Sequence, residues 1–224
     1  MNYFAHALPF LDDPYYAVGT AVPDMLMVVD RRARLRAKRV APLLRADEGR
    51  TVSVAGGLLQ HFRDDARFHE TRAFAETSLA LTVLVRDALE AESGFRPSFL
   101  GHLLVEVLLD ASLIAEHPAE LEQYFQRMAS VDPRAVEAVV NRALPRPTDR
   151  LAPMIAGFSD ERFLSDYLED AKLMVRLGQI MRRVKLPPLP AEFQELLPQA
   201  RSLVNRRRRE LLDGIPTSPP MANP

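Results

Sequence analysis

Two triplets of side chains that commonly bind metals recur in the sequence at a spacing of four residues. In chain order they are His61, Asp65 and His69, and then His102, Glu106 and Asp110. Side chains four residues apart lie on one side of an α-helix, with Cβ atoms about 5–6 Å apart. Imidazole and carboxylate groups together suit Zn, Mn or Fe. The spacing therefore predicts two helices that face each other and hold one or two divalent ions, with all six side chains as candidate ligands.

The second triplet lies in an unusually apolar setting. Apart from the triplet, residues 99–110 are almost wholly apolar, so its polar stripe is expected to point into the protein. A buried charge needs a partner, and a cation offsets the desolvation that bare carboxylates would suffer in a core. The alternative is a polar seam in which this triplet pairs with arginines such as Arg63 or Arg67. We favour the metal site, because a buried cluster of histidines and acids is a metal or catalytic candidate.

Two residues near the start of the chain are further candidate ligands. His6 is expected on a short first helix, where surface, packing and ligand roles all remain open. Asp24 follows Pro23 in an apolar segment, where an acid is either the N-cap of a helix or a ligand. His117 precedes Pro118 and is sufficiently explained as a loop or cap residue.

The composition is that of an ordinary globular protein, with 47% hydrophobic and 26% charged residues in 224. This length allows one substantial core, so one all-α domain is expected over residues 1–214, followed by a disordered proline-rich tail over 215–224. The chain contains no cysteine, which excludes disulfides and thiolate ligands. Any metal must therefore be held by nitrogen and oxygen donors.

Helical periodicity runs through nearly the whole chain, without two-residue alternation between hairpin turns. The pattern predicts an all-α bundle of roughly eight to ten helices with the metal site between helices. A glycine in a helix costs about 1 kcal/mol, so the pair Gly56–Gly57 weakens the helix unless a close packing contact needs it, and Gly57 would let a neighbouring backbone or a substrate approach. A loop is expected around the prolines at 145, 147 and 153. The main helices are expected at residues 51–71, 73–91, from 97 onward, 119–128, 133–143, 159–184 and 191–212.

Charge is balanced overall but clustered locally. The formal net charge is −1, so no global field selects a polyanionic partner. Positive residues gather at 31–39 and 206–209, which indicates either a solvated helix face or a docking surface for an acidic partner. Few aromatic residues lie among these arginines, which argues against a nucleic-acid partner without excluding it. We find no leader-type segment and no uninterrupted apolar run near the ~18 residues of a membrane span, so a cytoplasmic protein without membrane contact is expected.

The candidate ligands belong to a longer series of motifs. Met1–His6 reads Met-Asn-Tyr-Phe-Ala-His, and residues 57–65 read Gly-Leu-Leu-Gln-His-Phe-Arg-Asp-Asp. Further members of the series are Gly19, Thr20, Asp24, Glu106 and Asp110. In order and spacing, over roughly residues 1–115, the series resembles the acyl carrier protein phosphodiesterases, all-α relatives of the HD-type metal phosphohydrolases. The resemblance implies an HD-like fold and a metal-dependent phosphodiesterase that acts on the phosphopantetheine arm of acyl carrier protein.

The chain also departs from that family. Phe62 stands where the family has arginine, Ala111 stands where it has histidine, and His102 is an additional candidate ligand. A His-x3-Asp-x3-His segment followed by His-x3-Glu is also similar to the helix ligands of zinc-dependent phospholipase C and the S1/P1-type nucleases. A hydrolase of that second type is therefore an alternative. Both resemblances imply phosphoester chemistry at a metal.

The combined interpretation is a phosphodiester hydrolase with one or two divalent ions. The expected ligands of one ion are His6, Asp24 and His61, and those of the other are His69, His102 and Glu106. Asp65 is expected to bridge the ions and to act in catalysis, and Asp110 to be a ligand, an orienting residue or the general acid. Candidate residues for contact with the phosphoester substrate are Arg63, Arg32 and Arg36.

Two readings without catalysis remain open. A helical protein that kept the metal fold would bind a metal, nucleotide or partner without turnover, and the residues Phe62 and Ala111 support this alternative. A purely structural helical domain predicts no metal and no effect of a chelator on stability, because nothing would be lost from the folded state.

Overall fold

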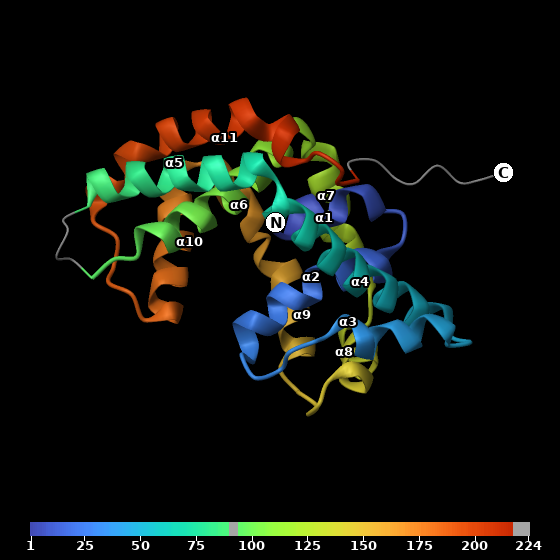
Figure 1. The fold of residues 1–224 in the computed structure, drawn as a ribbon. Coiled ribbons are helices and arrows are strands. Elements are labelled where there is room, and N and C mark those ends of the chain that lie inside the picture. The colour runs from blue at the N-terminus through green and yellow to red at the C-terminus, as the bar shows by residue number, and fades with distance from the viewer. Residues whose placement is uncertain (90–93, 217–224) are drawn as a thin grey trace. The chain divides into compact units, whose positions relative to one another are not determined.

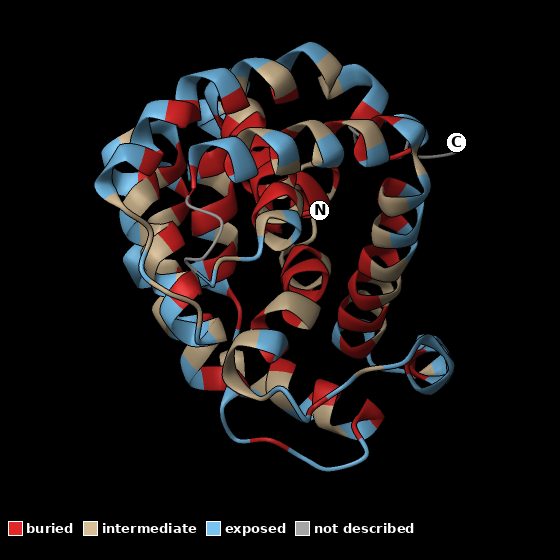
Figure 2. Ribbon diagram, turned by 60° about the vertical axis from the view of Figure 1, so that its left-hand side comes forward, coloured by how far each residue is buried: buried red, intermediate tan, exposed pale blue. Residues whose placement is uncertain are grey.

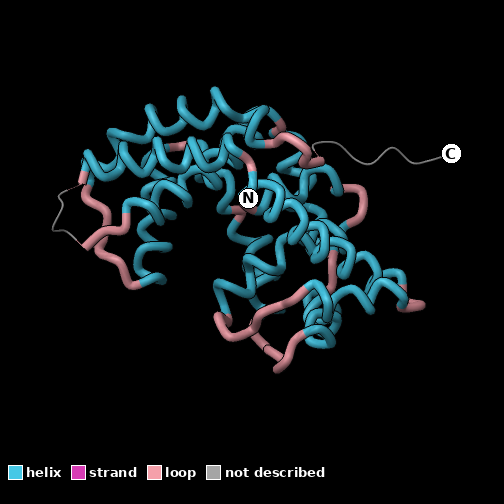
Figure 3. The backbone as a smooth tube through the Cα atoms, in the orientation of Figure 1, coloured by secondary structure: helices cyan, strands magenta, loops and turns pink. Residues whose placement is uncertain are grey.

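Helices account for all of the regular secondary structure in the part of the chain that the computed structural model describes, residues 1–89 and 94–216 (Figure 1 and Figure 3). No β-strand occurs within these ranges, so the predicted all-α class is confirmed. The elements are, in chain order, α1 (Tyr3–Ala7), η1 (Leu8–Phe10), α2 (Pro14–Val29), α3 (Ala37–Val40), η2 (Ala41–Arg45), α4 (Gly49–Glu70), α5 (Arg72–Ala88), α6 (Pro97–Glu116), α7 (Pro118–Ser130), α8 (Pro133–Ala143), α9 (Leu151–Glu161), η3 (Phe163–Leu168), α10 (Asp170–Val184), η4 (Ala191–Leu196) and α11 (Leu197–Leu211), where η marks a 3₁₀ helix.

The chain packs into two compact units. Unit 1 contains Arg67–Glu116 and Phe163–Gly214 together with Met1, and unit 2 contains Asn2–Ala66 and His117–Arg162 together with Ile215. Each unit thus combines segments from both halves of the sequence. The single domain expected over residues 1–214 stays a prediction. Within the expected tail, Ile215 is buried, and residues 217–224 lie outside the described part.

Helix α6 is the core helix of unit 1. It packs against α5, and α11 packs against both. Figure 2 shows the general pattern, in which helices carry buried residues on one flank and exposed residues on the other. A Cβ on Gly101 would lie 2.4 Å from Thr82 Oγ1 and 2.8 Å from Ser78 O, so α6 and α5 approach closely just before His102. By length and composition α6 is also long and apolar enough to cross a membrane. Of its most apolar 18-residue stretch, however, 61% is buried inside the protein, as is usual for a core helix.

In unit 2, helices α2 and α4 cross backbone to backbone. A Cβ on Gly57 would lie 2.1 Å from the carbonyl oxygen of Tyr16 and 2.9 Å from Gly19 Cα, and a Cβ on Gly19 would lie 2.5 Å from Val54 O. Such distances leave no room for a side chain. The close contact predicted from Gly56–Gly57 is therefore confirmed, and it places His61, one turn further along α4, beside α2.

The alternative role of Asp24 as an N-cap is wrong, because Pro23 and Asp24 both lie inside α2. The N-cap of this helix is Asp13, whose Oδ1 accepts the backbone N–H of Tyr16 at 3.1 Å, with Pro14 at the first helical position. Pro14 thus occupies the first turn of α2, where proline is common, and Pro23 lies inside the same helix.

The segment around residues 145–184 was also predicted wrongly. Residues 151–161 form α9 instead of a loop, because Glu137 Oε2 accepts the backbone N–H groups of Leu151 and Ala152, each at 2.9 Å. The expected helix from 159 to 184 is interrupted, since Arg162 adopts a left-handed conformation with φ of 47° that ends α9. Its second half forms α10. The other predicted helices agree with α4, α5, α6, α7, α8 and η4 with α11 within a few residues, except that residues 90 and 91 lie outside the described part.

Candidate metal centre

Three ligand-type side chains converge in unit 2. They are His6 on α1 and His61 and Asp65 on α4, called here the His6 group, and one ligand atom from each lies within 4.8 Å of the others. The two imidazole rings stack with centroids 4.2 Å apart. His6 is fully buried and His61 is 3% exposed, whereas a third of the Asp65 side chain is exposed. The group therefore combines a dry interior with one open side.

A hydrogen bond fixes the protonation of His61. Its Nδ1 lies 2.8 Å from the carbonyl oxygen of Thr20, which can only accept, so Nδ1 carries the proton and donates it. The lone pair is then on Nε2, which lies 3.6 Å from Asp65 Oδ2 and 4.0 Å from Asp24 Oδ1. Burial lowers the pKa of His61 to about 3, and the neighbouring His6 acts in the same direction. Neutral imidazole with a free Nε2 lone pair is the form that binds metal.

His6 presents a polar atom that has no hydrogen-bond partner. Its Nε2 is buried and lies 3.3 Å from Asp65 Oδ1 without hydrogen-bond geometry, and its Nδ1 lies 3.5 Å from Asp64 Oδ2. Burial alone would lower the pKa of His6, but the neighbouring Asp64 and Asp65 outweigh it and raise the pKa. A buried unpartnered nitrogen facing a carboxylate calls for a cation, either a proton or a metal ion.

The carboxylate of Asp65 is held in its ionised form. Burial by itself raises its pKa, but the interaction with His6 and the charges around it keep the pKa well below the ordinary range of aspartate. A carboxylate that stays ionised beside two imidazoles is a suitable ligand for a divalent ion. The residues of the His6 group therefore fit a metal ion by donor type, and His61 and Asp65 fit it by protonation as well.

His61 makes stability depend on pH in a direction that can be tested. The ordinary pKa of histidine is about 6.5, so the unfolded chain binds a proton at this residue below pH 6.5. The folded chain binds that proton only near pH 3, so the folded state loses stability as the pH falls from 6.5 to 3. With chelator present, wild type should lose about 1.4 kcal/mol of unfolding free energy per pH unit more than His61→Gln between pH 6 and pH 4. Urea denaturation at pH 6, 5 and 4 measures this, and equal slopes for the two proteins would contradict a neutral His61.

Unit 1 contains a second convergent group. It consists of His69 at the end of α4 and His102 and Glu106 on α6, called here the His102 group, and its ligand atoms also lie within 4.8 Å of one another. Glu106 Oε1 lies 3.3 Å from His69 Nε2 and 3.1 Å from His102 Nε2. The two imidazoles stack with centroids 5.0 Å apart, and the ring of Phe74 packs edge-on against both. Phe74 therefore holds both rings toward the carboxylate.

Glu106 is surrounded by positive or hydrogen-donating groups. The amine of Met1 lies 3.3 Å from Oε1 in addition to the two imidazoles. Burial alone would raise the pKa of Glu106, but the Met1 amine and the bonds from His102 and His69 hold it well below the usual range. The polar-seam alternative assigned arginine partners to this triplet. Instead, His102 and Glu106 contact each other, His69 and the Met1 amine among the described residues.

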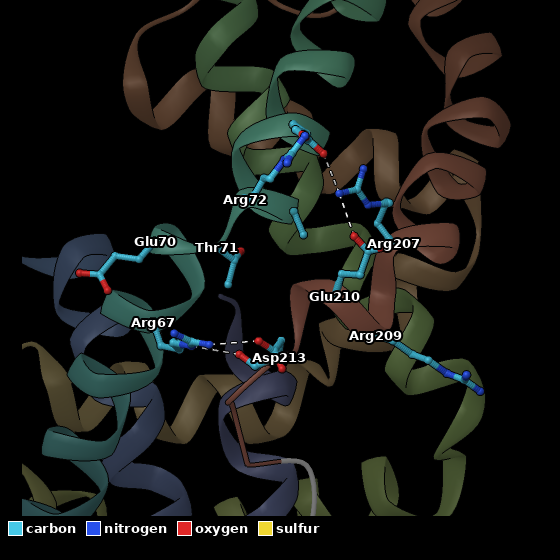
Figure 4. A pocket seen from close by; sticks show the side chains of 10 residues that line it. Arg67, Glu70, Thr71, Arg72, Arg207, Arg209, Glu210 and Asp213 are labelled. Carbon is cyan, nitrogen blue, oxygen red and sulfur yellow. Dashed lines mark hydrogen bonds and ion pairs between the residues drawn. The ribbon is translucent and has the colours of Figure 1, made fainter.

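One of the arginines suggested for the seam, Arg67, is engaged elsewhere in unit 1. Arg67 donates from Nε to the Asp213 carbonyl oxygen at 3.1 Å and from Nη2 to Asp213 Oδ2 at 3.0 Å. Figure 4 shows this pair in a cavity of about 850 Å³, where Arg207 also contacts Glu210. Neither ligand group lines the cavity, and its charges are largely paired with one another, so the two groups are the candidate metal centres.

The remaining predicted site residues lie outside the two groups of ligand candidates. Asp24 lies on α2 at the edge of the His6 group, 4.0 Å from His61 Nε2. Asp110 lies on α6 one turn after Glu106 and is fully buried, but it belongs to neither group. Arg63 is exposed on α4 and donates to Gln60 Oε1 at 2.6 Å. Arg32 and Arg36 are exposed between α2 and α3. The bridging role expected of Asp65 involves ligands in both units and stays a prediction.

Two buried residues next to the His6 group were not predicted from the sequence. Gln60 Nε2 donates to Asp64 Oδ1 at 2.6 Å, and the other oxygen of Asp64 faces His6. Gln60 and Asp64 are four residues apart on α4, on the same side as each other, and the repeated acid of Asp64-Asp65 was the available signal. The interpretation of α4 counted only residues in register with His61.

No family model, no curated protein and no solved structure matches this chain. The resemblances drawn from the sequence motifs therefore remain predictions, and the geometry of the two groups is the basis for any functional conclusion.

Proposed function

We propose that this chain is a divalent-metal-dependent hydrolase of phosphoesters. The observation that carries the proposal is the arrangement of the His6 group, in which His61 Nε2 must be an acceptor, His6 Nε2 lacks a partner, and both face the ionised Asp65. Atoms that carry lone pairs repel one another in a buried site unless a cation lies between them. Two nitrogens and carboxylate oxygens suit zinc, manganese or iron.

We extend the proposal to the His102 group in unit 1 on its donor set alone, because both imidazoles there already lie at hydrogen-bond distance from Glu106 Oε1. Two imidazoles and one carboxylate with a depressed pKa make up its donor set, as in the His6 group. A bound divalent ion supplies Lewis acidity and lowers the pKa of bound water, which is the chemistry that phosphoester hydrolysis needs. The chain's own residues would hold the ions, with His6, His61 and Asp65 in one group and His69, His102 and Glu106 in the other.

The substrate class comes from the sequence resemblance. Acyl carrier protein phosphodiesterases supply the expectation of a phosphoester, with the phosphopantetheine arm of acyl carrier protein as the specific candidate. Arg63 is exposed on α4, where it donates to Gln60 Oε1, and is a candidate for a contact with a phosphate oxygen. Phe62, whose ring packs edge-on against His61, occupies the position of the family's arginine and supports the alternative of a metal-binding protein without turnover.

Metal content and hydrolysis of bis-p-nitrophenyl phosphate, measured on the same samples, test this function. We expect stoichiometric metal and measurable hydrolysis in wild type. His61→Ala should lower the hydrolysis by more than about 100-fold, since loss of even an outer partner of a metal ligand typically costs about 10–100-fold. The matched control is His117→Ala, because His117 contacts Glu120 and lies outside both groups. Bound metal without hydrolysis would support the binding protein instead, and absence of metal would contradict both.

A further inference from the structure

Asp64 and Gln60 make a continuous hydrogen-bonded path to His6 within unit 2. Gln60 Nε2 donates to Asp64 Oδ1 at 2.6 Å, and Asp64 Oδ2 lies 3.5 Å from His6 Nδ1. Asp64 is 4% exposed and Gln60 is 8% exposed. These residues are too far inside to be a solvated surface pair, and neither is one of the metal-ligand candidates. Their contacts therefore act on His6.

The orientation of the Gln60 amide is determined by its other neighbours. Its Oε1 accepts from Arg63 Nη2 at 2.6 Å and from the hydroxyl of Tyr16 at 3.4 Å. Guanidinium can only donate, so the oxygen of the amide must face Arg63 and the NH₂ group must face Asp64. Asp64 Oδ1 is thereby occupied as an acceptor, and Oδ2 is the oxygen left for the imidazole.

A carboxylate oxygen beside His6 Nδ1 determines the tautomer of the ring. An ionised carboxylate can only accept, so Nδ1 carries the proton and the lone pair lies on Nε2, the buried atom that faces Asp65. Carboxylates commonly orient metal-bound histidines in this way, and loss of one typically costs about 10–100-fold in metal affinity. Thr20 O fulfils the same role for His61.

We propose that Asp64, held in place by Gln60, is a positioning residue that fixes the Nδ1–H tautomer of His6 and so presents its Nε2 lone pair to a metal ion. This inference rests on the proposed metal function, but the tautomer is a property of the metal-free chain as well. Asp64 is not among the ligand candidates of the His6 group. Its effect passes through His6.

The variant Asp64→Asn tests the inference with little change of shape. Because Gln60 must still donate to position 64, the new amide has to turn its oxygen toward Gln60 and its NH₂ group toward His6 Nδ1. Nδ1 then becomes an acceptor, the proton moves to Nε2, and the ligand lone pair is lost. We expect ¹⁵N NMR of the metal-free protein at pH 9 to show Nδ1–H in wild type and Nε2–H in Asp64→Asn. Zinc affinity, measured against a chelating dye, should fall about 10–100-fold.

The double variant Gln60→Leu/Asp64→Asn separates positioning from structural support. Without the NH₂ group of Gln60, the amide at position 64 is free to present its oxygen to His6, which should restore the Nδ1–H tautomer and recover at least about ten-fold in zinc affinity. A merely structural role predicts that the double variant is worse than the single one. Asp13→Asn is the matched control, because Asp13 also accepts two hydrogen bonds, from Tyr16 N and Ser53 Oγ, and should leave zinc affinity unchanged.

The outcomes distinguish this inference from the proposed function. An Nε2–H tautomer in wild type, or unchanged tautomer and zinc affinity in Asp64→Asn, would overturn the positioning role. Wild type with the Nδ1–H tautomer, reversed in Asp64→Asn, would support that role even if the protein bound no zinc. In that case only the metal-dependent function would fail.

Discussion

Saturating zinc is expected to raise the unfolding free energy of the wild-type chain by about 4 kcal/mol per occupied site when free zinc is near 1,000 times the dissociation constant. The His6 group draws its ligands from α1 and α4, and the His102 group draws its ligands from α4 and α6. The unfolded chain does not hold ligands so distant in sequence together, so metal binds the folded chain preferentially. Urea denaturation with zinc and with chelator measures the difference.

Variants that lack one ligand measure how much of the zinc stabilisation comes from each group. His61→Ala should remove the contribution of the His6 group and lower the bound zinc by one ion, and His102→Ala should do the same for the His102 group. The double variant His61→Ala/His102→Ala should bind no zinc, and chelator should not change its unfolding free energy. His117→Ala should behave as wild type, since this residue belongs to neither group. Equal stability of wild type with zinc and with chelator would refute metal binding and favour a purely structural helical protein.

The substitution Gly57→Ala should be one of the most destabilising single-methyl changes in the molecule. The added Cβ would lie 2.1 Å from the carbonyl oxygen of Tyr16, and backbone cannot rotate away as a side chain can. Overpacking in a well-packed interior typically costs about 1–3 kcal/mol, and a clash with backbone belongs at or beyond the upper end. Chemical denaturation gives the change in unfolding free energy. Zinc affinity should fall as well, because α4 would shift away from Thr20 and release His61.

Gly157→Ala is the matched control for this prediction. Gly157 lies inside α9 in the same unit, and a Cβ there would meet nothing within 4 Å. Alanine should therefore stabilise the protein by about 0.5–1 kcal/mol through helix propensity alone. If Gly57→Ala were as well tolerated as Gly157→Ala, the close crossing of α2 and α4 would be wrong, and with it the present account of how His61 is held.

Local periodicity was enough to predict α4, α6 and the ligand candidates on them. Side chains four residues apart share a helix face whatever the tertiary fold, so His61 with Asp65 and His102 with Glu106 could be paired from the sequence. His6 needed the further information of a motif, because nothing local distinguishes a ligand from a packed histidine. The glycine pair at 56–57 also predicted its packing contact correctly, since glycine in a helix has a cost that only close approach offsets.

Two of the errors, at α9 and at Asp64, arise from contacts between residues that are distant in the sequence. Helix α9 depends on an acceptor from Glu137 in α8, which no pattern near residue 151 reveals. A helix N-cap was one of the two roles considered for Asp24, although the N-cap of α2 is Asp13, eleven residues earlier. Asp64 was passed over because its importance lies in its distance from His6, which is 58 residues away in sequence. Asp110 was included on its spacing, its apolar setting and the motif resemblance, and these assign a helix face but not a neighbour.

The unequal exposure of the His6 group gives the site an entrance. His6 is sealed from water and His61 nearly so, whereas about a third of the side chains of Asp65 and Asp24 is exposed. An incoming cation would therefore meet negative oxygens before it meets nitrogens, and would exchange its hydration water stepwise as it moves inward. The same ordering would leave the outermost coordination positions, beside the carboxylates, as the ones that a substrate oxygen can reach.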